Sequence, residues 1–264
     1  LACQLSHPNT IEIYDYGRTP AGIFYYAMEY LDGFCIDSMV QVAGPVPPGR
    51  VVHLLSQACG SLAEAHARGF LHRDIKPSNI MVTQLGGVYD TTKVLDFGLA
   101  KDLASDDRSE ADIIAGTPLY LAPEVILSAE SYSAQSDLYA LGALAYFMLC
   151  GQTIFPPAEM SEILAMQLED KIPFPSERLG RSLPEELEYL VMACLAKDPA
   201  QRPVSAVRLA TMLAACDCPA WTPEDARLWW QTYGEAAGNV SRPDRSLGTA
   251  NAAGVESMFD AARM

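Results

Sequence analysis

The chain has 264 residues, with 33 acidic against 18 basic side chains and a formal net charge of −15 at pH 7. Proteins that bind the phosphate backbone of nucleic acids are usually basic, so this charge argues against a nucleic-acid partner and is compatible with basic protein substrates. Half of the residues are hydrophobic and 19% are charged, which is typical of a globular protein with a large core.

The distribution of cysteines indicates the cellular compartment, and the length of the apolar runs indicates whether a segment could span a membrane. The seven cysteines are spread along the chain, which favours free thiols in a reducing compartment, so we expect a cytoplasmic protein. Cys216 and Cys218 lie close together, but no second Cys/His pair flanks them, so the pattern does not predict a zinc site. The longest apolar run, Leu138 to Cys150, is too short for a membrane span and predicts a buried helix.

The first 31 residues predict a helix end and two strands. Residues 1–6 are typical of the last turns of a helix, which the sequence His7-Pro8-Asn9 ends because proline disfavours helix in the residue before it. Alternation over 11–16 and the β-branched and aromatic run 23–31 each predict a strand.

Helical patterns dominate the rest of the chain. Residues 47–69 begin with two prolines suited to a helix N-terminus, repeat apolar residues at helical spacing and end at a glycine. Residues 69–82 and 92–101 predict two short strand–loop elements. Helices dominate again from Pro123, and the polar, small residues that follow Gly234 indicate a linker.

Three short motifs carry the chemistry of the chain. They are His72-Arg73-Asp74, followed by Lys76 and Asn79, then Asp96-Phe97-Gly98, then Ala122-Pro123-Glu124. Each residue taken alone is most often structural, because aspartate and asparagine are common turn formers and single motifs give many false positives. The order and spacing of all three motifs make coincidence a negligible explanation.

This ordered set resembles the eukaryotic-type protein kinase family over about residues 1–215. The segments HRDIKPSNIMV and GTPLYLAPEV are most similar to those of bacterial serine/threonine kinases. The resemblance implies an α+β, protein-kinase-like fold, mostly the helical C-terminal lobe with a remnant of the β-rich N-terminal lobe. It divides the chain into an N-lobe remnant (1–33), the kinase C-lobe (34–216), an aromatic helix (217–236) and a linker or tail (237–264).

The resemblance also implies ATP and Mg²⁺ as cofactors and a serine or threonine hydroxyl of a protein as the acceptor. Asp74 would accept the proton of that hydroxyl, and Lys76 would offset charge on the γ-phosphate. Asn79 and Asp96 offer the oxygen ligands that Mg²⁺ prefers, and Asp96 would bridge through the metal to the β- and γ-phosphates. Thr117 matches the family position that contacts Asp74 and Lys76, a combination typical of serine/threonine kinases.

Five further motif residues are expected to be scaffold. By the same resemblance, Asp137 caps the back of the catalytic loop, and Glu124 forms a buried ion pair with Arg202. His72 and Phe97 are structural neighbours of the catalytic residues.

The segment AMEYLDG matches the family's hinge between the two lobes. The Glu29 carbonyl and the Leu31 amide would bond the edge of adenine, with Met28 as gatekeeper behind it and Met81 packed under the base. The same residues also fit an ordinary apolar strand. The number of residues between this segment and the catalytic loop favours the interpretation as a hinge.

The sequence contains neither the glycine-rich loop nor the strand lysine that hold the phosphates in this family. The family places the HPN segment about nine residues after a helix glutamate, and here His7 is the seventh residue. We therefore expect the chain to begin inside that helix and to be inactive by itself. The alternative is a pseudokinase-like interaction scaffold, although the presence of Asp74, Asn79 and Asp96 favours a catalytic parent.

The activation loop, residues 101–118, holds one candidate regulatory feature. A phosphate on Ser105 or Ser109 could order the activation loop by pairing with Arg73, but the acidic residues of this loop could equally pair with Arg73 or stay solvated.

The segment WTPEDARLWWQTYGEAA resembles a helix with a capping box at Thr222 and Asp225. Its aromatic face, Trp229, Trp230 and Tyr233, either folds back on the large lobe or provides a docking site for a partner.

Overall fold

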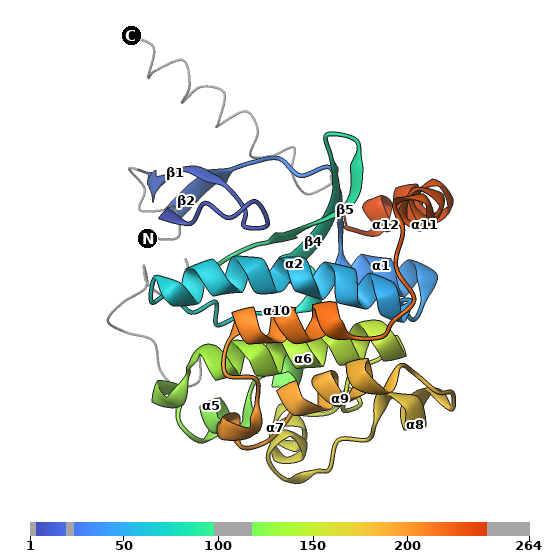
Figure 1. Cartoon of the computed structure of the whole chain (residues 1–264). Helices are drawn as coiled ribbons and strands as arrows, with labels where there is room; N and C mark the ends of the chain where they lie inside the picture. Colours follow the sequence, from blue (N-terminus) through green and yellow to red (C-terminus); the bar gives the residue numbers. More distant parts are fainter. Residues whose placement is uncertain (1–3, 20–23, 98–117, 242–264) are drawn as a thin grey trace.

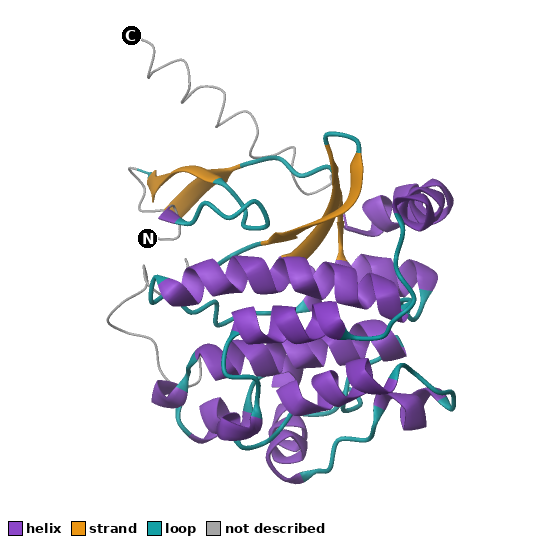
Figure 2. Ribbon diagram, in the orientation of Figure 1, coloured by secondary structure: helices purple, strands orange, loops and turns teal. Residues whose placement is uncertain are grey.

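The computed structural model describes residues 4–19, 24–97 and 118–241, with the strands gathered on one side of a helical body (Figures 1 and 2). Strands β1 (Ile13–Arg18) and β2 (Phe24–Met28) form an antiparallel two-stranded sheet. Strands β3 (Gly33–Cys35), β4 (Ile80–Leu85) and β5 (Val88–Val94) form a second antiparallel sheet in that order.

The helices follow the expected α+β arrangement, and that expectation is confirmed. The longer ones are α1 (Ile36–Ala43), α2 (Pro48–Ala67), α6 (Ala134–Cys150), α7 (Met160–Glu169), α9 (Glu185–Cys194) and α10 (Ala206–Ala215). The shorter ones are α5 (Pro123–Leu127), α8 (Pro175–Leu179), α11 (Pro223–Trp229) and α12 (Glu235–Ser241). The helical turns are η2 (Pro77–Asn79), η3 (Pro118–Tyr120), η4 (Ala129–Ser131), η5 (Pro199–Gln201) and the π-helical η6 (Trp230–Gly234).

Helix α6 is the centre of the core, as the apolar run of its sequence predicts. Nearly all of its residues are buried, which a helix apolar on every side requires. Ser133 and Ser136 form a capping box at its start, and Gly151 ends it in the left-handed conformation with φ 70°. Within the described residues, every helix is too short or too polar to cross a bilayer. The six cysteines described there are free thiols.

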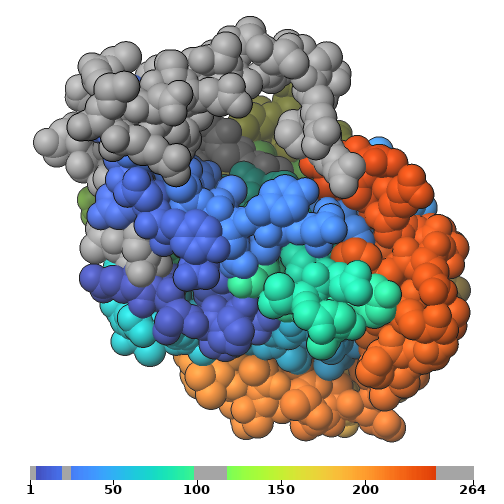
Figure 3. Space-filling view, turned by 90° about the horizontal axis from the view of Figure 1, so that it is seen from above, coloured from blue at the N-terminus to red at the C-terminus, as the bar shows by residue number. Residues whose placement is uncertain are grey.

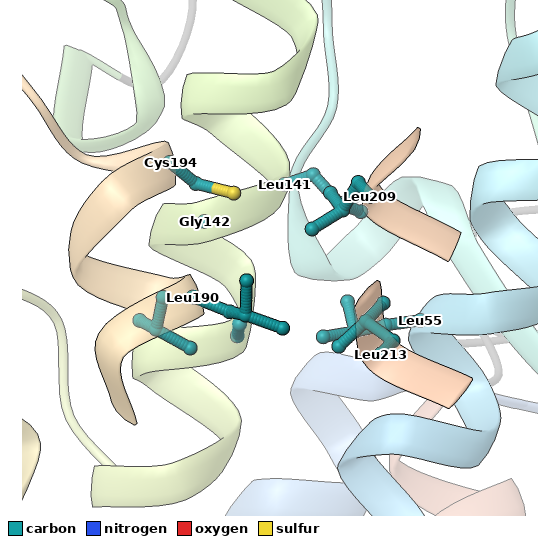
Figure 4. A pocket seen from close by; sticks show the side chains of 9 residues that line it. Leu55, Leu141, Gly142, Leu190, Cys194, Leu209 and Leu213 are labelled. Atoms are coloured by element: carbon teal, nitrogen blue, oxygen red, sulfur yellow. The ribbon is translucent and has the colours of Figure 1, made fainter. Parts of the chain in front are cut away.

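Helices α6 and α9 approach each other closely at Gly142. A Cβ atom at Gly142 would lie 2.6 Å from the Cβ of Cys194, so this position requires glycine although glycine weakens a helix. Figure 4 shows the Cys194 side chain beside Gly142 at the edge of a small apolar cavity. The cavity, about 10 Å³, is lined by α2, α6, α9 and α10 through side chains such as Leu55 and Leu213. An apolar space of this size stays dry.

The N-terminal residues are anchored on helix α2. The Asn9 amide donates to Gln57 Oε1 at 2.9 Å and to the Thr92 carbonyl at 2.7 Å. The ring of His7 lies so close to Gly60 that a Cβ there would approach it to 2.6 Å. The strand expected over 11–16 therefore begins two residues later, at Ile13, because the chain before it is held against α2 and β5.

The second strand pair also differs in its bounds. The strand expected to begin at residue 92 begins at Val88, because Gly86 and Gly87 form a tight turn with φ 58° and 87°. Two glycines at positive φ are typical of a two-residue hairpin loop.

The C-terminal segment, residues 217–241, folds back on the helical body through Trp229 and Trp230, whereas Tyr233 stays 38% exposed. Trp229 and Trp230 pack on the buried ring of Phe34, with ring centroids 5.2 and 4.6 Å away. Figure 3 shows this segment, in orange and red, against the surface of β3, α1 and the β4–β5 hairpin. The capping box at Thr222 and Asp225 is present. Residues 237–241 of the expected linker belong instead to α12.

A buried carboxylate, Asp90 on β5, holds this segment in place. Asp90 forms a bidentate ion pair with Arg50, both side chains being fully buried. It also accepts the indole N–H of Trp221 at 2.7 Å and that of Trp230 at 2.8 Å. The Arg50 guanidinium lies 3.9 Å from the ring centroid of Trp229. The C-terminal aromatic residues are thus part of one buried polar cluster.

Replacing Asp90 by Asn should lower the free energy of unfolding by about 3–5 kcal/mol, the range for a buried ion pair that loses one partner. Asparagine tolerates the φ of 57° at this position but supplies one acceptor oxygen where four N–H donors converge. Denaturant titration measures the change. Glu224→Gln, which breaks the exposed pair with Arg227, is the matched control and should leave the midpoint unchanged. Equal midpoints for Asp90→Asn and wild type would contradict this account.

Candidate active site

A single carboxylate on α6 holds the predicted catalytic loop, residues 72–79, in place. Asp137 is fully buried and accepts the backbone N–H groups of His72 at 2.9 Å and Arg73 at 3.0 Å. It also accepts the Tyr132 hydroxyl at 2.6 Å and lies 2.8 Å from His66 Nε2. Burial alone would raise the pKa of Asp137, but the hydrogen bond from His66 and the other donors lower it below its usual range. The expected capping role is confirmed.

This anchoring stabilises an unusual backbone. Arg73 has φ 65°, a left-handed conformation that costs energy for a residue with a side chain. The two hydrogen bonds to Asp137 offset that cost and turn the next residue, Asp74, away from the core. The side chain of Asp74 is 38% exposed.

Three of the predicted catalytic residues meet at Asp74. Its Oδ2 lies 2.7 Å from Lys76 Nζ and accepts from Asn79 Nδ2 at 2.8 Å. The same Asn79 nitrogen donates to the Asp74 carbonyl at 2.9 Å. The carboxylate is therefore fixed in orientation by a cation and an amide, while its exposure leaves it accessible to a substrate hydroxyl.

Asp96 is brought to the same place by backbone contacts. The Leu95 N–H donates to the Asn79 carbonyl at 2.9 Å, and the Leu95 carbonyl lies 2.8 Å from His72 Nε2. Asp96 follows with φ 52° and accepts the Tyr26 hydroxyl at 3.3 Å. The ends of η2 and β5 thus place Asp96 beside the catalytic loop.

Asn79 and Asp96 fit a magnesium ion by their donor chemistry. Because Nδ2 of Asn79 faces Asp74, its Oδ1 is the atom available to a cation. Mg²⁺ is usually held by one or two protein oxygens together with phosphates and water. In the residues that the structure describes, no three His, Cys, Asp or Glu side chains gather as a metal cluster, so this site would depend on the nucleotide for its other ligands.

A second ion pair ties α5 to the late helices. Glu124 lies 2.7 and 2.8 Å from the guanidinium nitrogens of Arg202, and its Oε1 accepts from Ser136 at 2.7 Å. Burial raises the pKa of Glu124, but the bonds from Arg202 and Ser136 outweigh this and lower it. The expected Glu124–Arg202 pair is confirmed.

The proposed hinge connects β2 to β3. The Glu29 N–H donates to the Glu12 carbonyl at 2.9 Å, and the Glu29 carboxylate lies 2.5 Å from Lys93 Nζ. Met28 ends β2 and is 42% exposed, while Met81 lies on β4 opposite Cys35. The adenine contacts of Met28, Glu29, Leu31 and Met81 stay a prediction.

The protein kinase domain profile matches residues 1–213. The chain belongs to the protein kinase family. Among curated kinases it is 35% identical to the serine/threonine-protein kinase pkn3 of Myxococcus xanthus over 82% of this chain and 40% of that protein. It is 33% identical to PknB of Mycobacterium tuberculosis over 92% of this chain and 39% of that protein.

The fold of this chain is similar to that of solved kinase structures. The kinase domain of PknI from Mycobacterium tuberculosis is 26% identical, with a TM-score of 0.59 over 81% of this chain and 74% of that chain. The chain spans about 40% of the length of the two curated kinases named above. The expected resemblance to bacterial serine/threonine kinases is therefore confirmed.

Several kinase residues expected from the sequence lie outside the described residues. They are Thr117, the candidate phosphate acceptors Ser105 and Ser109, and residues 1–3 of the expected N-terminal helix end. The expected helix does not continue through Leu5 and Ser6, which are not helical. Sequence reasoning also missed four contacts of the site. Tyr26 bonds Asp96, Lys93 pairs with Glu29, and His66 and Tyr132 complete the shell of Asp137. No local motif marks them, because each partner is distant in sequence or outside the kinase signatures.

Protonation of His72 should destabilise the protein. Its Nδ1 accepts the Asp74 N–H at 3.2 Å, which only the neutral ring can do, and burial lowers the pKa of His72. The unfolded chain binds this proton near pH 6.5 and the folded chain does not, so the stabilisation is complete above pH 6.5 and is lost as pH falls.

We therefore expect the free energy of unfolding to fall by about 1 kcal/mol between pH 6.5 and 5.5 from this residue. Denaturant titrations across that range measure the slope. The slope should be smaller in His72→Phe than in wild type, and identical slopes would show that His72 does not control it.

Proposed function

We propose that this chain carries the catalytic loop of a kinase that transfers the γ-phosphate of ATP to serine or threonine hydroxyls of cytoplasmic proteins. The observation that carries the proposal is the arrangement around Asp74. Lys76 and Asn79 orient this exposed carboxylate, and Asp96 lies beside them. The membership of the protein kinase family and the similarity to bacterial serine/threonine kinases support the same reaction.

Each of these residues has a separate proposed role in phosphoryl transfer. Asp74 orients the acceptor hydroxyl and takes its proton, and Lys76 lies close enough to offset charge on the phosphate that moves. Asn79 and Asp96 would hold Mg²⁺, which supplies charge neutralisation at the β- and γ-phosphates. Since the transition state is loose, catalysis depends on position and electrostatics more than on covalent chemistry. Thr117 is proposed to join Asp74 and Lys76.

Replacing Asp74 by Asn should lower kcat by about 10²–10⁴-fold, the usual contribution of a general base. The amide keeps the size of the side chain but cannot take the proton. The KM for ATP should change little, because Asp74 makes few ground-state contacts with the nucleotide. The assay measures phosphate transfer from labelled ATP to histone, in an upstream-extended chain, a fusion that adds a kinase glycine-rich loop and strand lysine before Leu1. Asp217→Asn, an exposed site after α10, is the control and should keep wild-type turnover. A mutant with half of the wild-type kcat would overturn the role of Asp74.

The 264-residue chain by itself should transfer no measurable phosphate. Its sequence holds neither the glycine-rich loop nor the strand lysine, which together fix the phosphates in line for transfer. The same histone assay compares it with the upstream-extended chain. Equal activity of the two chains would refute this expectation. No activity in either chain would instead favour the alternative of a non-catalytic, pseudokinase-like scaffold.

A further inference from the structure

Gln167 on α7 is a fully buried polar side chain that contacts the segment before α5. Its Nε2 donates to the Leu119 carbonyl at 2.9 Å and to the Pro118 carbonyl at 3.3 Å. Its Oε1 accepts the hydroxyl of Tyr139 on α6 at 2.5 Å. One side chain therefore links α6 and α7 to the turn η3.

The orientation of this amide follows from its partners. Carbonyl groups only accept, so the side facing Pro118 and Leu119 must be the NH₂ group, and both of its hydrogens are used. The oxygen then faces the Tyr139 hydroxyl, which donates. No apolar side chain, and no shorter amide at this position, can satisfy all three groups. Buried polar networks that are completely satisfied fix one arrangement of the backbone.

Tyr139 and helix α7 are each fixed by further contacts. The Tyr139 ring is fully buried, with the guanidinium of Arg202 at 4.9 Å from its centroid. Arg202 pairs with Glu124 of α5. The Gln167 carbonyl accepts from Lys197 Nζ at 2.5 Å, which fixes α7 from the other side. The hydroxyl of Tyr139 is thus presented to Gln167 by a rigid support.

We propose that Gln167 is a positioning residue for the protein substrate, acting through residues 118–122. This inference rests on the proposed kinase function, in which residues 118–122 directly follow Thr117, the proposed partner of Asp74 and Lys76, and so lie next to the acceptor hydroxyl. The side chains of Pro118, Leu119 and Leu121 are only partly buried, whereas Tyr120 is buried. By fixing the carbonyls of Pro118 and Leu119, Gln167 sets the surface against which the acceptor residue of the substrate is held.

The first test needs no activity. Amide hydrogen exchange of the 264-residue chain is compared between wild type and Gln167→Met, which keeps the length of the side chain and removes its hydrogen bonds. Peptides covering residues 118–127 should exchange about tenfold faster, because two buried carbonyls lose their donor. Tyr139→Phe should produce a smaller increase in the same peptides, and it decides the question if Gln167→Met does not fold.

The matched control is Tyr146→Phe, which lies on α6, the helix that also carries Tyr139. Tyr146 is also fully buried, but its hydroxyl accepts from Arg178 and, among the described residues, forms no hydrogen bond with residues 118–122. This variant should leave exchange over 118–127 at the wild-type rate. Unchanged exchange in Gln167→Met, or an equal increase in Tyr146→Phe, would overturn the proposal.

The second test measures the consequence for catalysis in the upstream-extended chain. Gln167→Met should raise the KM for histone about tenfold while the KM for ATP stays within twofold, since the nucleotide contacts lie on other elements. A merely structural role would move both values together, and that result would overturn the proposal. If the wild-type chain transfers no phosphate at all, the proposed function fails, and the exchange experiment still decides whether Gln167 fixes residues 118–122.

Discussion

The carboxylate of Asp137 is the interaction on which the catalytic loop depends. It lies at the start of the most buried helix and accepts two backbone N–H groups from a loop 64 residues earlier in the chain. Those bonds hold Arg73 in a left-handed conformation and thereby direct Asp74 outward. A charge buried without partners would be very costly, but here His66 and Tyr132 complete its shell. Helix α6 thus fixes the position of Asp74, the proposed catalytic base.

The same physical arrangement recurs at three other places in the molecule. Asp90 collects donors from Arg50 and two indoles, Glu124 collects them from Arg202 and Ser136, and Gln167 joins Tyr139 to two carbonyls. Each cluster connects elements that are far apart in sequence. Such networks add little net stability over apolar packing, but they tolerate only one geometry. They account for how a lobe made mainly of apolar helix contacts can hold loops in defined positions.

The motifs of the sequence were sufficient to predict which residues would gather at one place. Asp74, Lys76, Asn79 and Asp96 were predicted from the resemblance of the ordered motifs to protein kinases, and the structure brings them together, while their roles stay a prediction. The hairpin turn at Gly86 was also readable in principle, since paired glycines between strands are a strong signal.

The sequence did not allow the polar clusters around Asp90 and Gln167 to be predicted. Asp90 lies 131 residues from Trp221 and 140 from Trp230, and short-range patterns carry no information on such pairs. Gln167 looks in the sequence like any polar residue of an amphipathic helix. The packing of α7 against η3 and α5, together with the Tyr139 hydroxyl from α6, buries it completely.

The C-terminal segment changes where the folding unit ends. The kinase profile stops at residue 213, yet Phe34 on β3 is fully buried under Trp229 and Trp230, and the Cys35 N–H donates to Ser241 at 3.0 Å. Strand β3 follows the proposed hinge directly and pairs through Cys35 with Met81, the residue expected under adenine. Without residues 217–241 the ring of Phe34 would lose its cover and Asp90 would lose two of its donors. The packed structure that supports β3 and the proposed adenine contact Met81 therefore extends to Ser241.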